Sequence, residues 1–334
     1  MSIKKAQSIL ADIKKGSVAP IYFLMGEESY YIDLISKYIE THVLSEEEKG
    51  FNQTVFYGRD ISVDEIVSYA KRYPLMAEKQ VIIIKEAQDL SRSLDALQPY
   101  IENPMPSTVL VFCYKYKSLD RRRKITKTLA KNAVLFESKK LYDNQVPSWL
   151  QSVAKEEGYT ISPKATHMLV EFLGTDLSKI KNELDKLQLI VPKGAEITPE
   201  HVEENIGISK DFNNFELQNA IGTKNYKKAF QITQHFAQDT SSNPFVLTLS
   251  LMHSFFTRLL KYHALENKGQ APKVLGVSPY FINQYRDAAQ AYPIRRVTAI
   301  LAELRELDLM SKGVGASNLT HDDLLKELLI RVFT

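Results

Sequence analysis

A glycine turn near the start of the chain is the first place where the residue types suggest chemistry. Gly26 follows the apolar run Ile21–Met25 and is followed by two glutamates. Many nucleotide-binding folds hold phosphate at such a turn, but the P-loop pattern GxxxxGK[ST] needs a lysine to neutralise the phosphates and a hydroxyl to bind magnesium. The next lysine here is Lys37. The turn is therefore predicted to bind no nucleotide.

A second position typical of nucleotide chemistry is the end of the third apolar run, Val81–Ile84, which continues as Lys85-Glu86-Ala87. Phosphoryl transfer would require acidic residues here that hold magnesium and polarise water. Glu86 stands alone and is more simply explained as a solvated residue at the end of a strand. Both positions indicate a nucleotide-type module kept for shape and assembly.

The cysteine and histidine content offers no other reactive site. The one cysteine, Cys113, lies in the apolar run Val109–Tyr114 and is predicted to belong to the core. The seven histidines are dispersed, without HExxH or Cys/His spacing. We therefore predict no catalytic residue, no cofactor and no metal site.

A basic segment lies between Lys115 and Lys140. It contains ten lysines and arginines, including the run Arg121, Arg122, Arg123 and Lys124, against two acidic residues, Asp120 and Glu137. Such a local excess of positive charge can contact DNA phosphates or an acidic surface on a neighbouring protein. The alternative is a solvated helix face, in which Asp120 caps a helix that contains residues 121–131. Both interpretations stay open, because the net charge of the whole chain is only +3.

The tetrapeptide Tyr73-Pro74-Leu75-Met76 is the other notable feature. Proline ends the preceding helix. From burial alone, Leu75 and Met76 are expected to pack into the protein's own core. Alternatively they form an exposed apolar plug for a partner, since burying each would contribute about 1.5–3 kcal/mol, enough for a binding hot spot.

The elements that position these residues change character near residue 140. Before it, apolar or β-branched runs alternate with segments of helical period and predict five strands, at 21–25, 54–57, 81–84, 108–114 and 134–137. Several runs are apolar at successive positions, as in a parallel sheet covered on both faces. Ser62 and Glu65 form a capping-box pattern that starts one of the intervening helices.

After about residue 143 we expect helices and no strand. Ser162-Pro163 and Thr198-Pro199 each predict a helix start, because a capping residue precedes a proline at the first helical position. Between them an apolar stripe at helical spacing indicates a buried helix, formed by Leu177, Ile180, Leu184, Leu187 and Leu189. A loop is expected at 207–214, followed by longer helices.

Length and composition suit a multidomain globular protein. At 334 residues the chain is expected to form three domains, at 1–140, 141–210 and 211–334. No apolar stretch approaches the roughly 20 residues of a membrane span, and residues 1–10 lack the apolar core of a signal peptide. We therefore expect a cytoplasmic protein without membrane contact.

Several separated segments resemble one known family, the delta subunits of bacterial DNA polymerase III, which are AAA+ clamp-loader proteins. They are PIYFLMGEESYYID (20–33), PLMAEKQVIIIKEAQDL (74–90), STVLVFCYKYKSLDRRRKITKTLAKNAVLFE (107–137), GTDLSKIKNELDKLQLI (174–190), DFNNFELQNAIGTKNYKKAF (211–230), VLGVSPYFINQY (274–285) and LRELDLMSKG (304–313). Their order and spacing span nearly the whole chain.

The resemblance implies an architecture and a role. The fold would be an α/β AAA+-like domain, with a five-stranded parallel sheet and no functional P-loop, followed by two all-α domains, a lid and a collar for oligomerisation. The protein would bind and open the sliding clamp (beta subunit) during DNA replication without hydrolysing ATP. It would act beside gamma/tau and delta prime type subunits and primer-template DNA. It would thus belong to a DNA-directed DNA polymerase holoenzyme, a nucleotidyltransferase complex.

The resemblance also assigns the site. Pro74, Leu75 and Met76 fall on the family's clamp-binding loop, with Met76 where an aromatic residue is frequent. This placement reverses the expectation of core burial. Two alternatives stay open: an active AAA+ ATPase with an atypical phosphate loop, and a DNA-binding scaffold protein outside replication.

Overall fold

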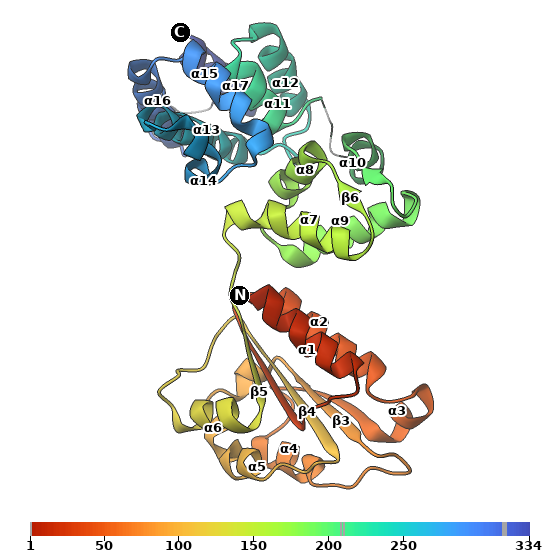
Figure 1. The fold of residues 1–334 in the computed structure, drawn as a ribbon. Coiled ribbons are helices and arrows are strands. Elements are labelled where there is room, and N and C mark those ends of the chain that lie inside the picture. The colour runs from red at the N-terminus through yellow and green to blue at the C-terminus, as the bar shows by residue number, and fades with distance from the viewer. Residues whose placement is uncertain (1, 208, 210, 316–318) are drawn as a thin grey trace. The chain divides into compact units, whose positions relative to one another are not determined.

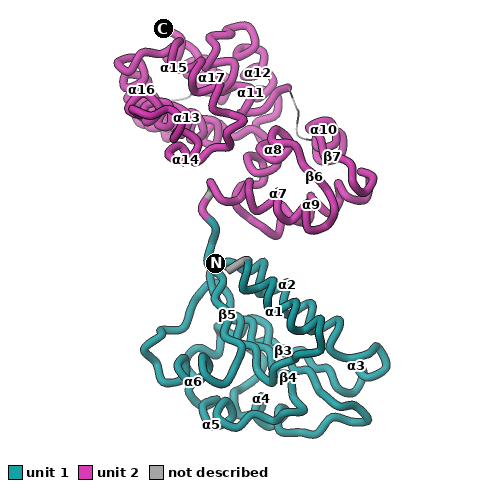
Figure 2. The backbone as a smooth tube through the Cα atoms, in the orientation of Figure 1, with its two compact units in different colours: residues 1–141 teal, residues 142–334 magenta. Residues whose placement is uncertain are grey.

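The computed structural model describes residues 2–207, 209, 211–315 and 319–334, which form two compact units divided between Leu141 and Tyr142 (Figure 2). The first unit contains one five-stranded sheet (Figure 1). Its strands are β1 (Ile21–Gly26), β2 (Gln53–Tyr57), β3 (Gln80–Lys85), β4 (Thr108–Lys115) and β5 (Val134–Ser138). All are parallel, in the order β2-β3-β4-β1-β5. The five predicted strands are confirmed.

Helices cover both faces of this sheet, which explains why its central strands are apolar at successive positions. Figure 1 shows α1 and α2 together on one face and α4, α5 and α6 on the other. The α-helices of the unit are α1 (Ser2–Lys14), α2 (Ser29–His42), α3 (Glu46–Asn52), α4 (Val63–Ala70), α5 (Gln98–Glu102) and α6 (Lys124–Asn132). Two short 3-10 helices, η1 (Ala87–Leu90) and η2 (Leu94–Leu97), follow β3. The predicted capping box of Ser62 and Glu65 starts α4.

The second unit is mainly helical. Its α-helices are α7 (Val146–Glu156), α8 (Pro163–Leu173), α9 (Leu177–Ile190), α10 (Pro199–Ile206), α11 (Asn214–Gly222), α12 (Tyr226–Gln238), α13 (Phe245–Ala264), α14 (Ala271–Leu275), α15 (Ile282–Ala291), α16 (Ile294–Ser311) and α17 (His321–Phe333). Short 3-10 helices are η3 (Asp143–Gln145), η4 (Lys268–Gln270) and η5 (Pro279–Phe281). Both predicted helix starts are confirmed, at Pro163 and Pro199.

The expectation of no strand in this half was wrong. β6 (Thr160–Ile161) and β7 (Glu196–Ile197) form a small parallel pair. Each has only two residues, too few for an alternating pattern to appear in the sequence. The Ser162 N–H also donates to the Ile197 carbonyl, so the pair joins the starts of α8 and α10.

The apolar stripe of α9 is confirmed except at its end. Leu177, Ile180, Leu184 and Leu187 are buried, whereas Leu189 is exposed. Leu189 lies two residues after Leu187, and a step of two positions turns toward another face of a helix.

The helices α11 to α17 share one core, built around residues such as Leu217, Phe256 and Leu325. The predicted division into a lid and a collar near residue 210 stays a prediction. Within the predicted loop at 207–214, residues 208 and 210 lie outside the described residues. No helix in the described part of the chain is long and apolar enough to cross a membrane.

Candidate functional site

The segment between α4 and β3 carries exposed apolar side chains. Leu75 is 56% exposed, Met76 is 97% exposed, and Tyr73 is also exposed, while Pro74 is partly buried. The expectation from burial alone, that Leu75 and Met76 pack into the core, was therefore wrong. The core at this end of the sheet is filled by Ile66, Ala70 and their neighbours on α4 and β3, which leaves the connecting residues outside.

The backbone of this apolar loop is nevertheless fixed. The side chain of Asn52, at the end of α3, accepts a hydrogen bond from the Leu75 N–H (2.7 Å) and donates one to the Leu75 carbonyl (2.9 Å). Asn52 is only 4% exposed. Met76 follows with a left-handed backbone (φ +54°), a conformation that a non-glycine residue rarely adopts. The end of α3, which is distant in the sequence, thus holds the loop in one conformation at Leu75.

A second set of hydrogen bonds fixes the end of α4, where the loop begins. Gln80 Nε2 donates to the Arg72 carbonyl (2.6 Å), and Thr108 Oγ1 donates to the Ala70 carbonyl (2.8 Å). Gln80 and Thr108 are the first residues of β3 and β4. Because the strands are parallel, the apolar loop lies at the amino edge of the sheet.

The glycine turn lies at the opposite, carboxyl edge. The Gly26 N–H donates to the Lys117 carbonyl (2.9 Å), and a Cβ at Gly26 would lie 1.9 Å from the Ser138 carbonyl oxygen. The carboxylate of Glu28 caps α2 by accepting from the Tyr30 N–H (3.0 Å). A negative charge therefore already occupies the helix start, where an anion would otherwise be favoured.

Ion pairs occupy the same edge at the ends of β3 and β4. Lys115 Nζ lies 2.8 Å from Asp33 Oδ1 and 3.4 Å from Glu86 Oε1. Burial lowers the pKa of Lys115, but hydrogen bonds and charges from Asp33 and Glu86 outweigh burial and hold that pKa above its ordinary value. Gln88 Nε2 also donates to Glu86 Oε2 (2.6 Å). Glu86 is thus a partly buried member of an ion pair, which corrects its interpretation as a solvated strand-end residue.

Cys113 is buried in β4, as predicted, and burial raises the pKa of its thiol to about 11. The thiol is therefore neutral and unreactive near neutral pH. Among the described residues, no group of three or more histidine, cysteine or acidic side chains is arranged to hold a metal ion.

The arginines of the basic segment each have an acidic partner within the first unit. Arg121 lies 2.6 Å from Glu137, Arg122 lies 2.7 Å from Asp120, and Arg123 lies 2.9 Å from Asp95. The side chains of Arg121 and Arg122 still point largely into solvent.

The helix of this segment is shorter than predicted. α6 begins at Lys124 with Arg123 as its N-cap residue, so Asp120 does not cap it. Asp120 instead accepts from the Arg122 N–H in the preceding turn. Lys124, Lys127 and Lys131 recur at intervals of three and four on α6 and are exposed. They form one stripe on the helix surface.

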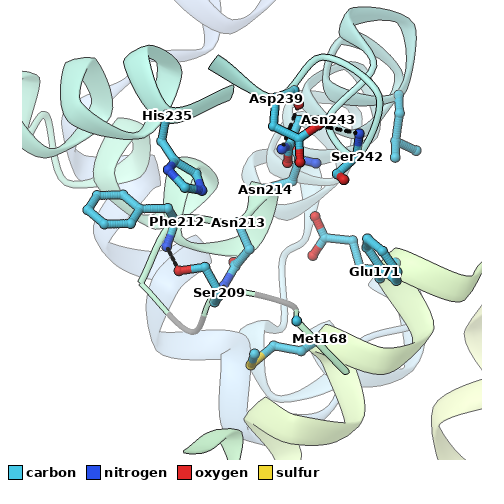
Figure 3. A pocket seen from close by; sticks show the side chains of 13 residues that line it. Met168, Glu171, Ser209, Phe212, Asn213, Asn214, His235, Asp239, Ser242 and Asn243 are labelled. Carbon is cyan, nitrogen blue, oxygen red and sulfur yellow. Dashed lines mark hydrogen bonds between the residues drawn. The ribbon is translucent and has the colours of Figure 1, made fainter. Parts of the chain in front are cut away.

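A cavity of about 80 Å³ lies in the second unit. Figure 3 shows side chains around it from α8, from Ser209 and residues 212–214, from the end of α12 and from the segment that follows α12. Its lining includes the carboxylates of Glu171 and Asp239 and, among the described residues, no lysine or arginine. Glu171 lies 3.2 Å from the His167 ring, and its side chain is 7% exposed. These charges disfavour a phosphate ligand.

The structure brings the predicted site residues into two separate places. Leu75 and Met76 share the loop at the amino edge, while residues 121–124 precede and begin α6 after β4. Sequence reasoning missed Asn52, which lies 23 residues before Leu75. The sequence near Asn52 carries no signal of this pairing, because the contact depends on β2 and β3 being neighbours.

Two family models match the chain. The model "DNA polymerase III, delta subunit" matches residues 22–139, and the model of the C-terminal domain of the same family matches residues 211–330. The first range contains the apolar loop, the glycine turn and most of the basic segment. The second contains α11 to α16 and nearly all of α17.

Individual relatives agree with the family models. The chain is 29% identical to DNA polymerase III subunit delta of Bacillus subtilis over 333 residues, covering 96% of this chain and 95% of the relative. It is 21% identical to the probable DNA polymerase III subunit delta of Aquifex aeolicus, covering 87% and 86%. The solved structure of the Bacillus subtilis DNA clamp loader delta protein matches with a TM-score of 0.57 and 27% identity, covering 98% of this chain and 99% of that one.

Proposed function

Because the chain belongs to the delta-subunit family of DNA polymerase III and is a clamp-loader component, we propose that it binds and opens the sliding clamp without hydrolysing ATP itself. The observation that carries this proposal is the apolar loop, where Leu75 and Met76 are exposed on a fixed backbone. Exposed apolar side chains on an ordered loop are typical of a binding site, because little entropy is lost when the partner covers them.

In this proposal Leu75 and Met76 enter an apolar pocket of the clamp, with Pro74 fixing the approach of the chain. Met76 suits such a pocket because its unbranched side chain adapts to irregular surfaces. Binding that is stronger to an opened or strained ring than to a closed one shifts the clamp toward the open form. Binding energy, and not a chemical step in this protein, then opens the ring.

Several features support the absence of ATP hydrolysis. The sequence at the glycine turn lacks the lysine and hydroxyl of a P-loop. The Gly26 N–H is engaged with Lys117, and the carboxylate of Glu28 lies at the start of α2. A triphosphate at this edge would also meet the carboxylates of Asp33 and Glu86. ATP bound by gamma/tau type partners would instead control when the clamp-binding loop is accessible.

For residues 121–124 of the basic segment, we propose contact with primer-template DNA or with a neighbouring loader protein, such as one of the delta prime type. The exposed side chains of Arg121 and Arg122 and the lysine stripe of α6 support this assignment. Their acidic partners within the unit reduce the net charge, so the lysines provide most of the excess.

Clamp binding by the full chain tests the main proposal. The double substitution Leu75→Ala and Met76→Ala is expected to weaken the Kd for the cognate clamp more than about a hundredfold, because two apolar anchors are lost. The matched control is Leu189→Ala with Ile190→Ala, which truncates two exposed apolar residues of α9 in the other unit. Equal clamp binding by the wild type and the Leu75/Met76 variant would refute the site.

The two alternative functions predict different results. An ATPase would bind and turn over ATP as the isolated chain. A scaffold outside replication would bind DNA tightly without partners and would not bind the clamp.

A further inference from the structure

The apolar loop combines exposed side chains with a constrained backbone, and at Leu75 the constraint comes from one residue outside the loop. Asn52 bonds to both the N–H and the carbonyl of Leu75, at 2.7 Å and 2.9 Å. Both backbone groups of Leu75 are therefore bonded to one side chain. Leu75, which is exposed and would bind the clamp, is thus hydrogen-bonded through its backbone to the buried side chain of Asn52.

The amide of Asn52 fits this task chemically. Its Nδ2 donates to the Leu75 carbonyl and also to the Glu48 carbonyl of its own helix (3.1 Å), while Oδ1 accepts from the Leu75 N–H. A single planar group therefore offers a donor and an acceptor to the same backbone residue. Aspartate keeps the shape and the acceptor but loses both donor bonds. Because Asn52 is 4% exposed, water has little access to replace these bonds.

We propose that Asn52 is a positioning residue for clamp binding, which holds Leu75 and Met76 in the conformation that enters the clamp. This inference rests on the proposed function. A loop released from Asn52 samples other conformations, and the apparent affinity falls in proportion to the fraction that remains competent. The neighbouring Met76, with φ +54°, depends on this support because its backbone conformation is unfavourable for a free methionine.

The test measures association and dissociation rates of the full-length chain with the immobilised cognate clamp. Asn52→Ala and Asn52→Asp are each expected to lower the association rate about tenfold while the dissociation rate changes little, because fewer molecules are competent at encounter. A residue that contacted the clamp directly would instead raise the dissociation rate. A wild-type association rate in both variants overturns the proposal.

A matched control separates positioning from general stability. Asn132 Nδ2 donates to the Ile101 carbonyl (3.2 Å) and thereby joins α6 to α5. Asn132→Ala is expected to lower the thermal midpoint of unfolding much as Asn52→Ala does, without changing the association rate. A loss of association rate in Asn132→Ala equal to that in Asn52→Ala would show that stability alone matters.

The outcomes also separate this inference from the proposed function. If the Leu75/Met76 variant binds the clamp normally, the proposed site fails and the positioning role fails with it. If that variant loses binding while both Asn52 variants keep the wild-type association rate, only the positioning role fails.

Discussion

At the scale of single residues, Gly26 shows how tightly the carboxyl edge of the sheet is built. Gly26→Ala is expected to lower the free energy of unfolding by more than about 3 kcal/mol, because the added Cβ meets the Ser138 backbone and φ is +133°. Gly207→Ala is the matched control. Gly207 has an ordinary left-handed backbone (φ +78°, ψ +17°), and no atom lies within 4 Å of the added Cβ, so backbone strain alone should cost about 1 kcal/mol. Urea denaturation of both variants measures the difference, and equal losses would contradict the close approach at Gly26.

Cys113 gives a second residue-scale prediction. Burial raises the pKa of its thiol from 9.0 to about 11. Because the folded-state value lies above the unfolded one, this group's contribution to stability is present below pH 9 and is lost as the pH rises toward 11. At about pH 8, below both values, iodoacetamide should therefore label Cys113 only after denaturation, as mass spectrometry can show. Rapid labelling of the native protein would contradict the burial.

The sequence predicted individual residues well where local pattern decides their environment and poorly where neighbours decide it. Cys113 and the helix start at Pro163 follow from adjacent residues. Whether Leu75 and Met76 are exposed depends on which residues fill the core beside them, and burial alone gave the wrong result there. Asn52 was missed because its partner is adjacent only after β2 and β3 have paired.

At the scale of elements, the helix of the basic segment begins later than predicted, so Arg121 and Arg122 lie in a turn before it and can be tested separately from the helix. The helix begins at Lys124 because Arg121 and Arg122 are in a turn closed by Asp120. In the assembled loader, Arg121→Glu with Arg122→Glu is expected to weaken DNA binding and reduce its salt dependence, if this turn contacts phosphates. Titrations at several salt concentrations give the slope.

The control for this experiment is Arg286→Glu in the second unit. Arg286 is exposed and lies 3.2 Å from its neighbour Asp287, much as Arg122 pairs with Asp120. It should leave the salt slope unchanged. If reversing Arg121 and Arg122 alters neither DNA binding nor loader assembly, the segment is only a solvated surface.

The five strands of the sheet were predictable because long buried runs have a clear composition. The pair β6 and β7 was not, since two residues carry no period and only their place before Ser162 and Thr198 marks them. Leu189 was wrongly assigned to the buried stripe of α9 because it is apolar and follows Leu184 and Leu187 closely, although its position two residues after Leu187 places it on another face.

At the scale of the whole molecule, the division at Leu141 makes a testable separation of functions. The fragment 1–141 has its own core and contains both Asn52 and the apolar loop. We expect it to fold alone and to bind the clamp with nearly the affinity of the full chain, as titration of the purified fragment would measure. Clamp binding by the fragment 142–334, and not by 1–141, would contradict the location of the site.

The direction of the strands separates the two ends of the first unit. The closed glycine turn and the ion pairs of Lys115 lie at the carboxyl edge, and the apolar loop lies at the amino edge. The missing P-loop residues predicted that the glycine turn binds no nucleotide, and the family resemblance predicted that the apolar loop binds a partner. Neither predicted that the two would lie on opposite edges, which follows from the parallel register alone.

The attachment of the apolar loop has a mechanical consequence. If Leu75 and Met76 bind an opened clamp as proposed, the closing force of the ring would act on β3 through residues 77–79 and on β2 through Asn52. These strands are hydrogen-bonded to each other from Gln53 and Val81 to Tyr57 and Lys85. The force would therefore be shared by the hydrogen bonds between β2 and β3, and it would not fall on one flexible residue.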